Sequence, residues 1–200
     1  MIPITINNFQ HYTIGGLTVS VKADLPFTQT TLRPKFRHFR LADPGPDKIV
    51  VWHHFRLPDL REFDHSSQVY RQNPWKILHQ GSQWIYMGMP ASKADPYIHM
   101  AAVFNEDHSY GDIYHPDDRL FRAGNLDALT LIPTDQILLA RVLAYRQACL
   151  LHAGGMILEG HGLACVGHSE AGKTTTAHML QGEGELLCDD RIILRRWPEG

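Results

Sequence analysis

The sequence contains the run Gly167-His168-Ser169-Glu170-Ala171-Gly172-Lys173-Thr174, which fits G-x-x-x-x-G-K-[ST], the pattern of a glycine-rich loop that binds phosphate groups. A strand-like apolar run, Gly162 to Val166, precedes the loop, and Thr174 to Leu180 can open a helix after it. Backbone N–H groups at the start of this helix would face phosphate oxygens, and the helix dipole favours negative charge there. The strand, loop and helix together predict a nucleotide-binding site.

Within the loop, Lys173 is expected to bridge the outer phosphates, and the Thr174 hydroxyl is expected to ligate Mg²⁺. His168 and Ser169 occupy positions that vary in this pattern, and Glu170 is expected to point away from the phosphates because it is an anion. The predicted nucleotide-binding residues are Gly167, His168, Ser169, Glu170, Ala171, Gly172, Lys173, Thr174 and Thr175.

Composition limits the classes of protein and partner. A chain of 200 residues forms one large or two small domains, and a net charge of −2 favours neither nucleic acid nor an anionic membrane as a partner. The N-terminus lacks a secretory signal, and the best apolar run, residues 137–145, is too short to span a membrane. The three cysteines, Cys149, Cys165 and Cys188, lack C-x-x-C spacing, which predicts buried, reduced thiols in a cytoplasmic protein.

Residues 1–128 are rich in strand signals and poor in helix signals. Two hairpins are predicted over residues 12–21 and 75–87, and further strands over residues 48–55 and 97–104. This half is expected to form an antiparallel β-rich domain. Residues 129–200 are expected to form a separate nucleotide-binding domain, so the fold class is α/β, or α+β over the whole chain.

The segment before the loop predicts a helix followed by a strand. Thr134 to Ala148 has helical periodicity with a capping residue at its start, and Leu150 to Leu158 is strand-like. Because only the turn Glu159 to Gly162 separates this strand from the loop strand, the two must be antiparallel. The strand carries His152, for which a place in the core and a role in an active site are both open.

After the loop, a helix over residues 173–181 leads to the strand Glu185 to Asp190. This strand ends in two carboxylates, Asp189 and Asp190, and is expected to lie beside the loop strand because a single helix joins them. Phosphoryl transfer needs Mg²⁺, a cation on the transferred group and a base for the acceptor. One carboxylate could ligate Mg²⁺ with Thr174, and the other could accept the hydroxyl proton.

The His152 strand, the loop and the Asp189-Asp190 pair, in this order, resemble the kinase domain of HPr kinase/phosphorylase and of its bacterial, PEP-carboxykinase-like relatives. The resemblance implies a kinase that uses ATP and Mg²⁺ to phosphorylate a serine hydroxyl, with a mixed sheet in its core. It implies that Asp189 is the catalytic base, that Lys173 and Thr174 hold phosphate, and that Thr174 and Asp190 hold the metal. Asp190 and His152 would line the same site.

Two features depart from that family. The N-terminal half does not resemble the family's N-terminal domain, so the phosphoryl acceptor could be a protein or a small molecule. Assembly of the chain into a homo-oligomer is also left open. The chain also stops ten residues after Asp190, whereas the family's domain continues, so a truncated core is expected. The alternatives are a nucleotide-binding regulatory module without catalysis and a small-molecule kinase of the shikimate-kinase kind.

Overall fold

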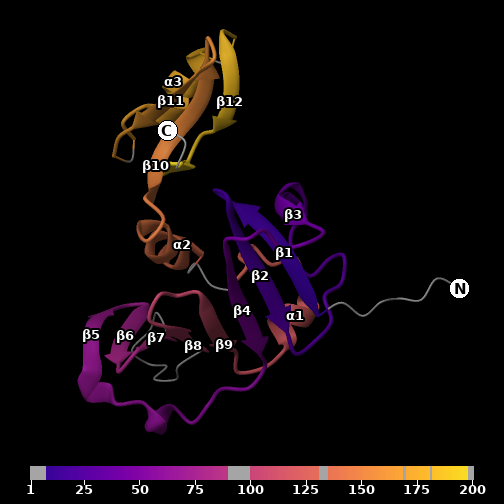
Figure 1. The fold of residues 1–200 in the computed structure, drawn as a ribbon, viewed down its shortest axis with the longest axis vertical. Coiled ribbons are helices and arrows are strands. Elements are labelled where there is room, and N and C mark those ends of the chain that lie inside the picture. The colour runs from indigo at the N-terminus through magenta and orange to yellow at the C-terminus, as the bar shows by residue number, and fades with distance from the viewer. Residues whose placement is uncertain (1–7, 90–99, 131–134, 169, 181, 198–200) are drawn as a thin grey trace, which may run out of the picture. The chain divides into compact units, whose positions relative to one another are not determined.

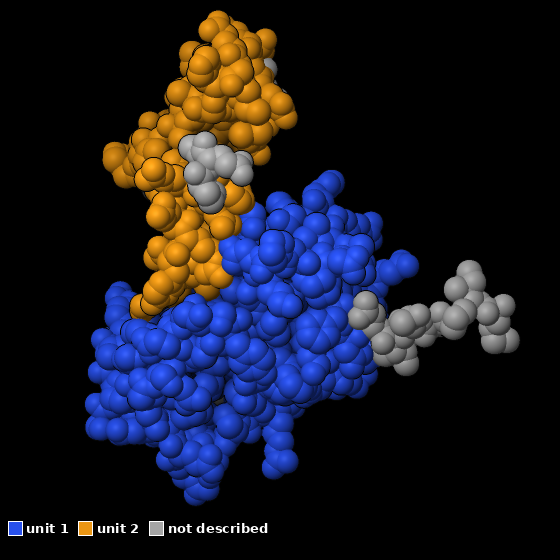
Figure 2. Space-filling view, viewed as in Figure 1, with its two compact units in different colours: residues 1–138 blue, residues 139–200 orange. Residues whose placement is uncertain are grey.

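The structure, a computed structural model, describes residues 8–89, 100–130, 135–168, 170–180 and 182–197. The chain divides into two compact units, residues 1–138 and 139–200 (Figure 2). This division falls inside helix α2 (Asp135–Ala144), later in the chain than the boundary at residue 128 inferred from the sequence. No helix in the described part of the chain has the length and apolar character needed to cross a membrane.

The first unit contains a nine-stranded sheet in the order β3-β1-β2-β4-β9-β8-β7-β6-β5 (Figure 1). Its strands are β1 (Phe9–Ile14), β2 (Leu17–Ala23), β3 (Arg40–Leu41), β4 (Lys48–His54), β5 (Gln68–Gln72), β6 (Trp75–Gln80), β7 (Gln83–Gly88), β8 (Met100–Asn105) and β9 (Tyr110–Tyr114). Its short helices are the 3₁₀ turns η1 (Pro34–Phe39), η2 (Leu60–Glu62) and η3 (His65–Ser67), and α1 (Arg119–Ala123).

Both hairpins predicted in the first unit are confirmed. β1 pairs with β2 through a turn at Gly15 and Gly16, whose φ angles of 57° and 74° suit a two-residue hairpin loop. The alternating residues Leu17, Val19 and Val21 are buried, so this face of β2 belongs to the core. β6 pairs antiparallel with β7, with Gly81 and Ser82 in the turn between them.

The sheet of the first unit is mixed, and the prediction of an antiparallel sheet was wrong in its centre. β2 pairs in parallel with β4, and β4 pairs in parallel with β9. Parallel neighbours need long connections, and here residues 24–47 separate β2 from β4 while β5 to β8 separate β4 from β9. The predicted strand over residues 97–104 is β8 from Met100 onward, and residues 97–99 lie outside the described part of the chain.

Two further corrections concern the start of the second unit. Helix α2 ends at Ala144, and Ala148 and Cys149 already belong to the next strand; the predicted capping residue Thr134 lies outside the described residues. After the helix, Gln147 takes a left-handed φ of 51°, and the chain enters β10 at the next residue. Cys149 is exposed, and Cys165 and Cys188 are only partly buried, contrary to the predicted burial, because the described part of this unit provides one helix to cover its sheet.

The second unit consists of β10 (Ala148–Leu158), β11 (His161–Val166), α3 (Lys173–Leu180), β12 (Gly184–Cys188) and β13 (Arg191–Arg195) (Figure 1). β10 pairs antiparallel with β11, as predicted, and also antiparallel with β12 and β13. The mixed sheet expected here is therefore not formed by the described residues. β12 was expected beside the loop strand, but β10 lies between β11 and β12.

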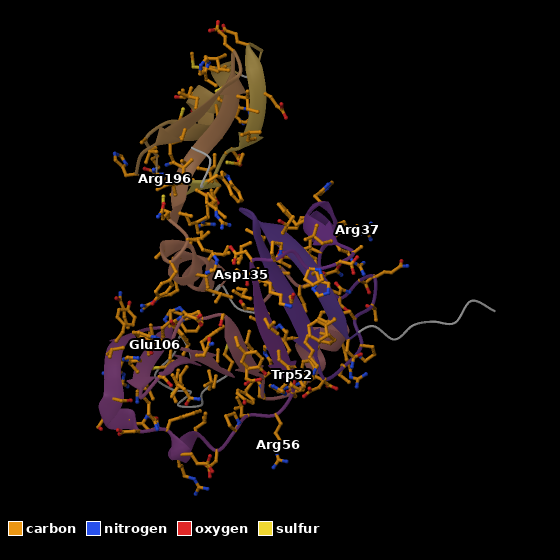
Figure 3. The ribbon with its side chains drawn as sticks, in the orientation of Figure 1. Arg37, Trp52, Arg56, Glu106, Asp135 and Arg196 are labelled. Atoms are coloured by element: carbon orange, nitrogen blue, oxygen red, sulfur yellow. The ribbon has the colours of Figure 1, made fainter. Side chains whose placement is uncertain are left out.

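A buried polar network inside the first unit includes the first residue of α2. His53 Nε2 donates to the Leu129 carbonyl (2.8 Å), so His53 Nδ1 accepts from His115 Nε2 (2.9 Å). The Asp135 carboxylate (Figure 3) accepts hydrogen bonds from the Leu129 N–H (2.7 Å) and the Thr130 N–H (2.8 Å). Burial raises the pKa of Asp135. Burial also lowers the pKa of both His53 and His115, which keeps this pair of histidines neutral inside the core.

Candidate nucleotide-phosphate site

The glycine-rich loop lies between the end of β11 at Val166 and the start of α3 at Lys173. The Lys173 side chain is only 8% exposed, and its Nζ donates to the His168 carbonyl across the loop (2.7 Å). The Ala171 N–H donates to the same carbonyl (3.2 Å). The lysine ammonium is therefore held over the loop, at the place where a phosphate could replace the carbonyl as its partner.

Steric constraints in the loop explain why both pattern positions, Gly167 and Gly172, are glycine. A Cβ on Gly167 would lie 2.9 Å from the Ala171 Cβ, so only glycine allows the loop to close this tightly. Gly172 has a φ of 82°, a conformation that glycine adopts without strain. The loop geometry thus follows from the two residues that define the sequence pattern.

Strand β10 joins the loop to the aspartate pair. Its residue Ala153 is the register partner of Val166, the last residue before the loop. On its other edge, the Ala153 N–H donates to the Asp190 carbonyl (3.0 Å). Since adjacent strands lie about 4.8 Å apart, the start of the loop and the backbone of Asp190 are separated by about 10 Å.

The aspartates interrupt a strand that otherwise runs along one edge of β10. Gly155 is paired with Cys188 of β12, and His152 is paired with Arg191 of β13. Two residues lie between these partners on each side, so one register runs from His152 to Gly155, and a bulge after Gly155 shifts the rest of β12 by one residue. This register places Asp189 opposite Gly154 and Asp190 opposite Ala153, at the level where β11 enters the loop.

The two carboxylates have different surroundings. Asp190 lies 3.1 Å from Arg191 Nη1 and 3.7 Å from His152 Nε2, and all three side chains are about half exposed. Asp189 is exposed, and within the described part of the chain its carboxylate makes no hydrogen bond or ion pair. Of the two aspartates, Asp189 is thus the one whose carboxylate has no partner among the described residues. Arg191 was not predicted as a site residue. Successive side chains of a strand point to opposite faces, so contact between Asp190 and Arg191 was not expected from the sequence.

The glycine pair of β10 allows close packing on both of its faces. A Cβ on Gly154 would lie 3.6 Å from both the Ala177 Cβ and the Lys173 carbonyl, so α3 packs directly on β10 at this point. A Cβ on Gly155 would lie 2.4 Å from Ile192 Cδ1. The helix that carries Lys173 is thereby anchored to the strand that carries His152.

The remaining predicted residues that the structure describes are exposed around the loop. Thr174 and Thr175 are exposed in the first turn of α3, and Glu170 is exposed with a left-handed φ of 66°. Ser169 lies outside the described residues. The structure thus groups the loop, His152 and the aspartate pair around the centre of β10.

The residues present are suited to a nucleotide-bound Mg²⁺. The described residues contain no group of three or more His, Cys, Asp or Glu side chains that could hold a metal ion alone. Mg²⁺ at a phosphate site needs fewer protein ligands, because phosphate and water oxygens complete its shell. The Thr174 hydroxyl makes no hydrogen bond within the described part of the chain, so it is available as a ligand.

No protein-family model, curated protein or solved structure matches the chain. A functional assignment therefore depends on the residues of the site and their geometry.

Proposed function

We propose that the second unit binds ATP with Mg²⁺ and transfers its terminal phosphoryl group to a serine hydroxyl. The observation that carries this proposal is the position of β10 between the phosphate loop and the Asp189-Asp190 pair. Phosphoryl transfer depends on positioning and on electrostatic stabilisation, and this arrangement brings the required groups to one level of the sheet.

Each residue has a defined role in this proposal. Lys173 and the loop N–H groups hold the phosphates, and Thr174 and Asp190 provide protein ligands for Mg²⁺. Asp189, which has no competing partner among the described residues, accepts the proton of the incoming hydroxyl. The Asp190–Arg191 pair is exposed, so giving it up for Mg²⁺ would cost no more than about 1 kcal/mol. His152 lies 3.7 Å from Asp190 and orients that carboxylate.

The pairing of β10 favours this proposal over a small-molecule kinase of the shikimate-kinase kind. Such enzymes resemble the present chain in placing carboxylates one helix after the loop, but their chain normally starts at the loop strand. Here an antiparallel strand with His152 precedes the loop strand and pairs with it over six residues. That neighbour belongs to the kinase architecture inferred from the resemblance.

A nucleotide-binding regulatory module is the second candidate, and exposed apolar residues favour it. Leu163 and Val166 of β11 and Met179 of α3 are 40%, 64% and 77% exposed. Such side chains suit contact with another protein. If the chain is such a module, nucleotide binding at the loop would change how these residues contact another protein, and no phosphoryl group would be transferred.

Incubation of the chain with terminally labelled ATP, Mg²⁺ and candidate acceptor proteins tests the two candidates. The kinase proposal expects label on a serine of one acceptor and an absolute requirement for Mg²⁺. Saturable nucleotide binding with no transfer to any acceptor would support the regulatory module instead. Label on a histidine or a carboxylate, identified by its acid or hydroxylamine lability, would contradict the assignment of a serine hydroxyl.

A further inference from the structure

A second polar cleft lies in the first unit, in a region with no part in the proposed phosphoryl transfer. It has a volume of about 260 Å³ and opens beside β1 and the 3₁₀ turn η1. Its polar lining residues include Gln10, Tyr12, Gln29, Arg33, Arg37 and Arg40. Three guanidinium groups therefore border one small cleft.

Two of these arginines lie at the end of the turn η1. The Arg40 N–H donates to the Arg37 carbonyl at the end of η1, which is the hydrogen bond of a 3₁₀ helix. Arg37 (Figure 3) lies in the last turn of η1, and Arg40 follows as its C-cap residue in extended conformation. Both side chains line the cleft, so two positive charges border it on this side of the turn.

No described carboxylate pairs with Arg37 or Arg40. Asp127 pairs with Arg33 (3.0 Å) and with Lys35 (3.2 Å). Arg37 and Arg40 have no ion-pair partner and no side-chain hydrogen bond within the described part of the chain. An anion in the cleft would therefore find two unpaired guanidinium groups, which bind carboxylate and phosphate oxygens in a bidentate manner.

A buried amide adds a donor to the wall of the cleft. Gln10 is 8% exposed, and its side-chain oxygen accepts a hydrogen bond from the Tyr12 hydroxyl. Burial raises the pKa of Tyr12 to about 12, so the phenol keeps its proton and donates. The Gln10 amide N–H groups have no partner within the described part of the chain. A ligand oxygen in the cleft could therefore accept a hydrogen bond from this amide.

We propose that this cleft binds a small ligand through a phosphate or carboxylate group, held by Arg37, Arg40 and the Gln10 amide. Its volume suits a ligand of few atoms rather than a nucleotide. A larger cleft of about 560 Å³ on the same unit lacks this character. There the His54 ring is hydrogen-bonded with Asp24 (3.0 Å) and Asp112 (2.9 Å), and the carboxylates of Asp24 and Asp59 border the cleft with a single arginine, Arg56.

Side-chain NMR of Gln10 tests the proposal directly. The full chain carrying Lys173→Ala, in which phosphate binding at the loop is weakened, is titrated with sodium phosphate and separately with sodium succinate at constant ionic strength. Arg37→Gln/Arg40→Gln is compared with Arg56→Gln/Arg71→Gln, which removes the same charge from exposed positions elsewhere in the unit. The Gln10 amide signals are the readout.

Saturating shifts of the Gln10 signals are expected with at least one anion. Affinity should fall tenfold or more in Arg37→Gln/Arg40→Gln and stay unchanged in the control. A response to phosphate alone assigns a phosphoryl ligand, a response to succinate alone a carboxylate ligand, and a response to both the shared chemistry. No saturable shift with either anion, or an equal loss of affinity in the control, would overturn the proposal.

Discussion

Replacing Asp189 by asparagine is expected to lower phosphoryl transfer about a thousandfold, within the range that general-base catalysis supplies. Asparagine keeps the size of the side chain but cannot accept the hydroxyl proton. A thousandfold loss corresponds to about 4 kcal/mol of transition-state stabilisation. ATP affinity should change by less than about twofold, because the loop and Lys173 contact the phosphates and Asp189 does not. Single-turnover transfer and a nucleotide titration measure the two quantities.

Glu185→Gln provides the matched control for this prediction. Glu185 is an exposed carboxylate on β12, the same strand that delivers Asp189. Transfer by this variant should equal that of the unsubstituted chain. If Asp189→Asn retained full transfer, or if both variants lost it equally, Asp189 would not be the base.

Lowering the pH from 7 to 5 is expected to reduce the stability of the first unit by about 4 kcal/mol through His53 and His115. Burial, and then the neighbouring His115, lowers the pKa of His53 from 6.5 to about 3. Burial, and then His54, lowers the pKa of His115 from 6.5 to about 4. At pH 5 the unfolded chain therefore binds protons that the folded chain excludes, which costs about 2 kcal/mol for each histidine.

The direction of this effect is fixed by the lowered pKa values. The stability from the neutral pair is fully present above pH 6.5, and it is lost progressively as the pH falls to the folded pKa values of about 4 for His115 and about 3 for His53. Protonating His53 would also place an N–H against the N–H of His115. Asp135 acts in the opposite direction, because its raised pKa lets the folded state gain a proton.

Urea unfolding at pH 7 and pH 5 measures this loss. Trp197 is the one tryptophan of the second unit, so Trp197→Phe leaves Trp52, Trp75 and Trp84 to report on the first unit alone. In His115→Gln the pH-dependent loss should fall to about 2 kcal/mol, since one titrating group remains. A loss that is unchanged in this variant would show that the histidine pair does not set the pH dependence.

The local features of the phosphate site could be predicted from the sequence. The motif glycines fix the loop by their steric freedom, and the two-residue turn between β10 and β11 forces antiparallel pairing. Glu159 and Gly160 take φ angles of 50° and 77° there, as such a turn requires. These features depend on a few residues that are neighbours in the chain.

The position of the aspartates could be predicted only in part. The sequence indicated carboxylates at the end of β12, but it placed that strand beside β11. Strand order depends on which hydrophobic faces pack together over long separations, and no short segment encodes it. Likewise, β4 pairs in parallel with β2 and β9 across connections of many residues, which leave no local signal in the sequence. The hairpins do leave such a signal, and from them alone an antiparallel sheet was predicted.

Calorimetric titration of the chain with ATP and Mg²⁺ tests the claim that the loop around Lys173 binds nucleotide phosphates. Saturable binding is expected, and Lys173→Ala should weaken it about 10- to 100-fold, the loss of one hydrogen bond from a charged donor. Lys48→Ala, which removes an exposed lysine at the start of β4, should bind as the unsubstituted chain does. Equal affinity in the unsubstituted chain and in Lys173→Ala would contradict the claim.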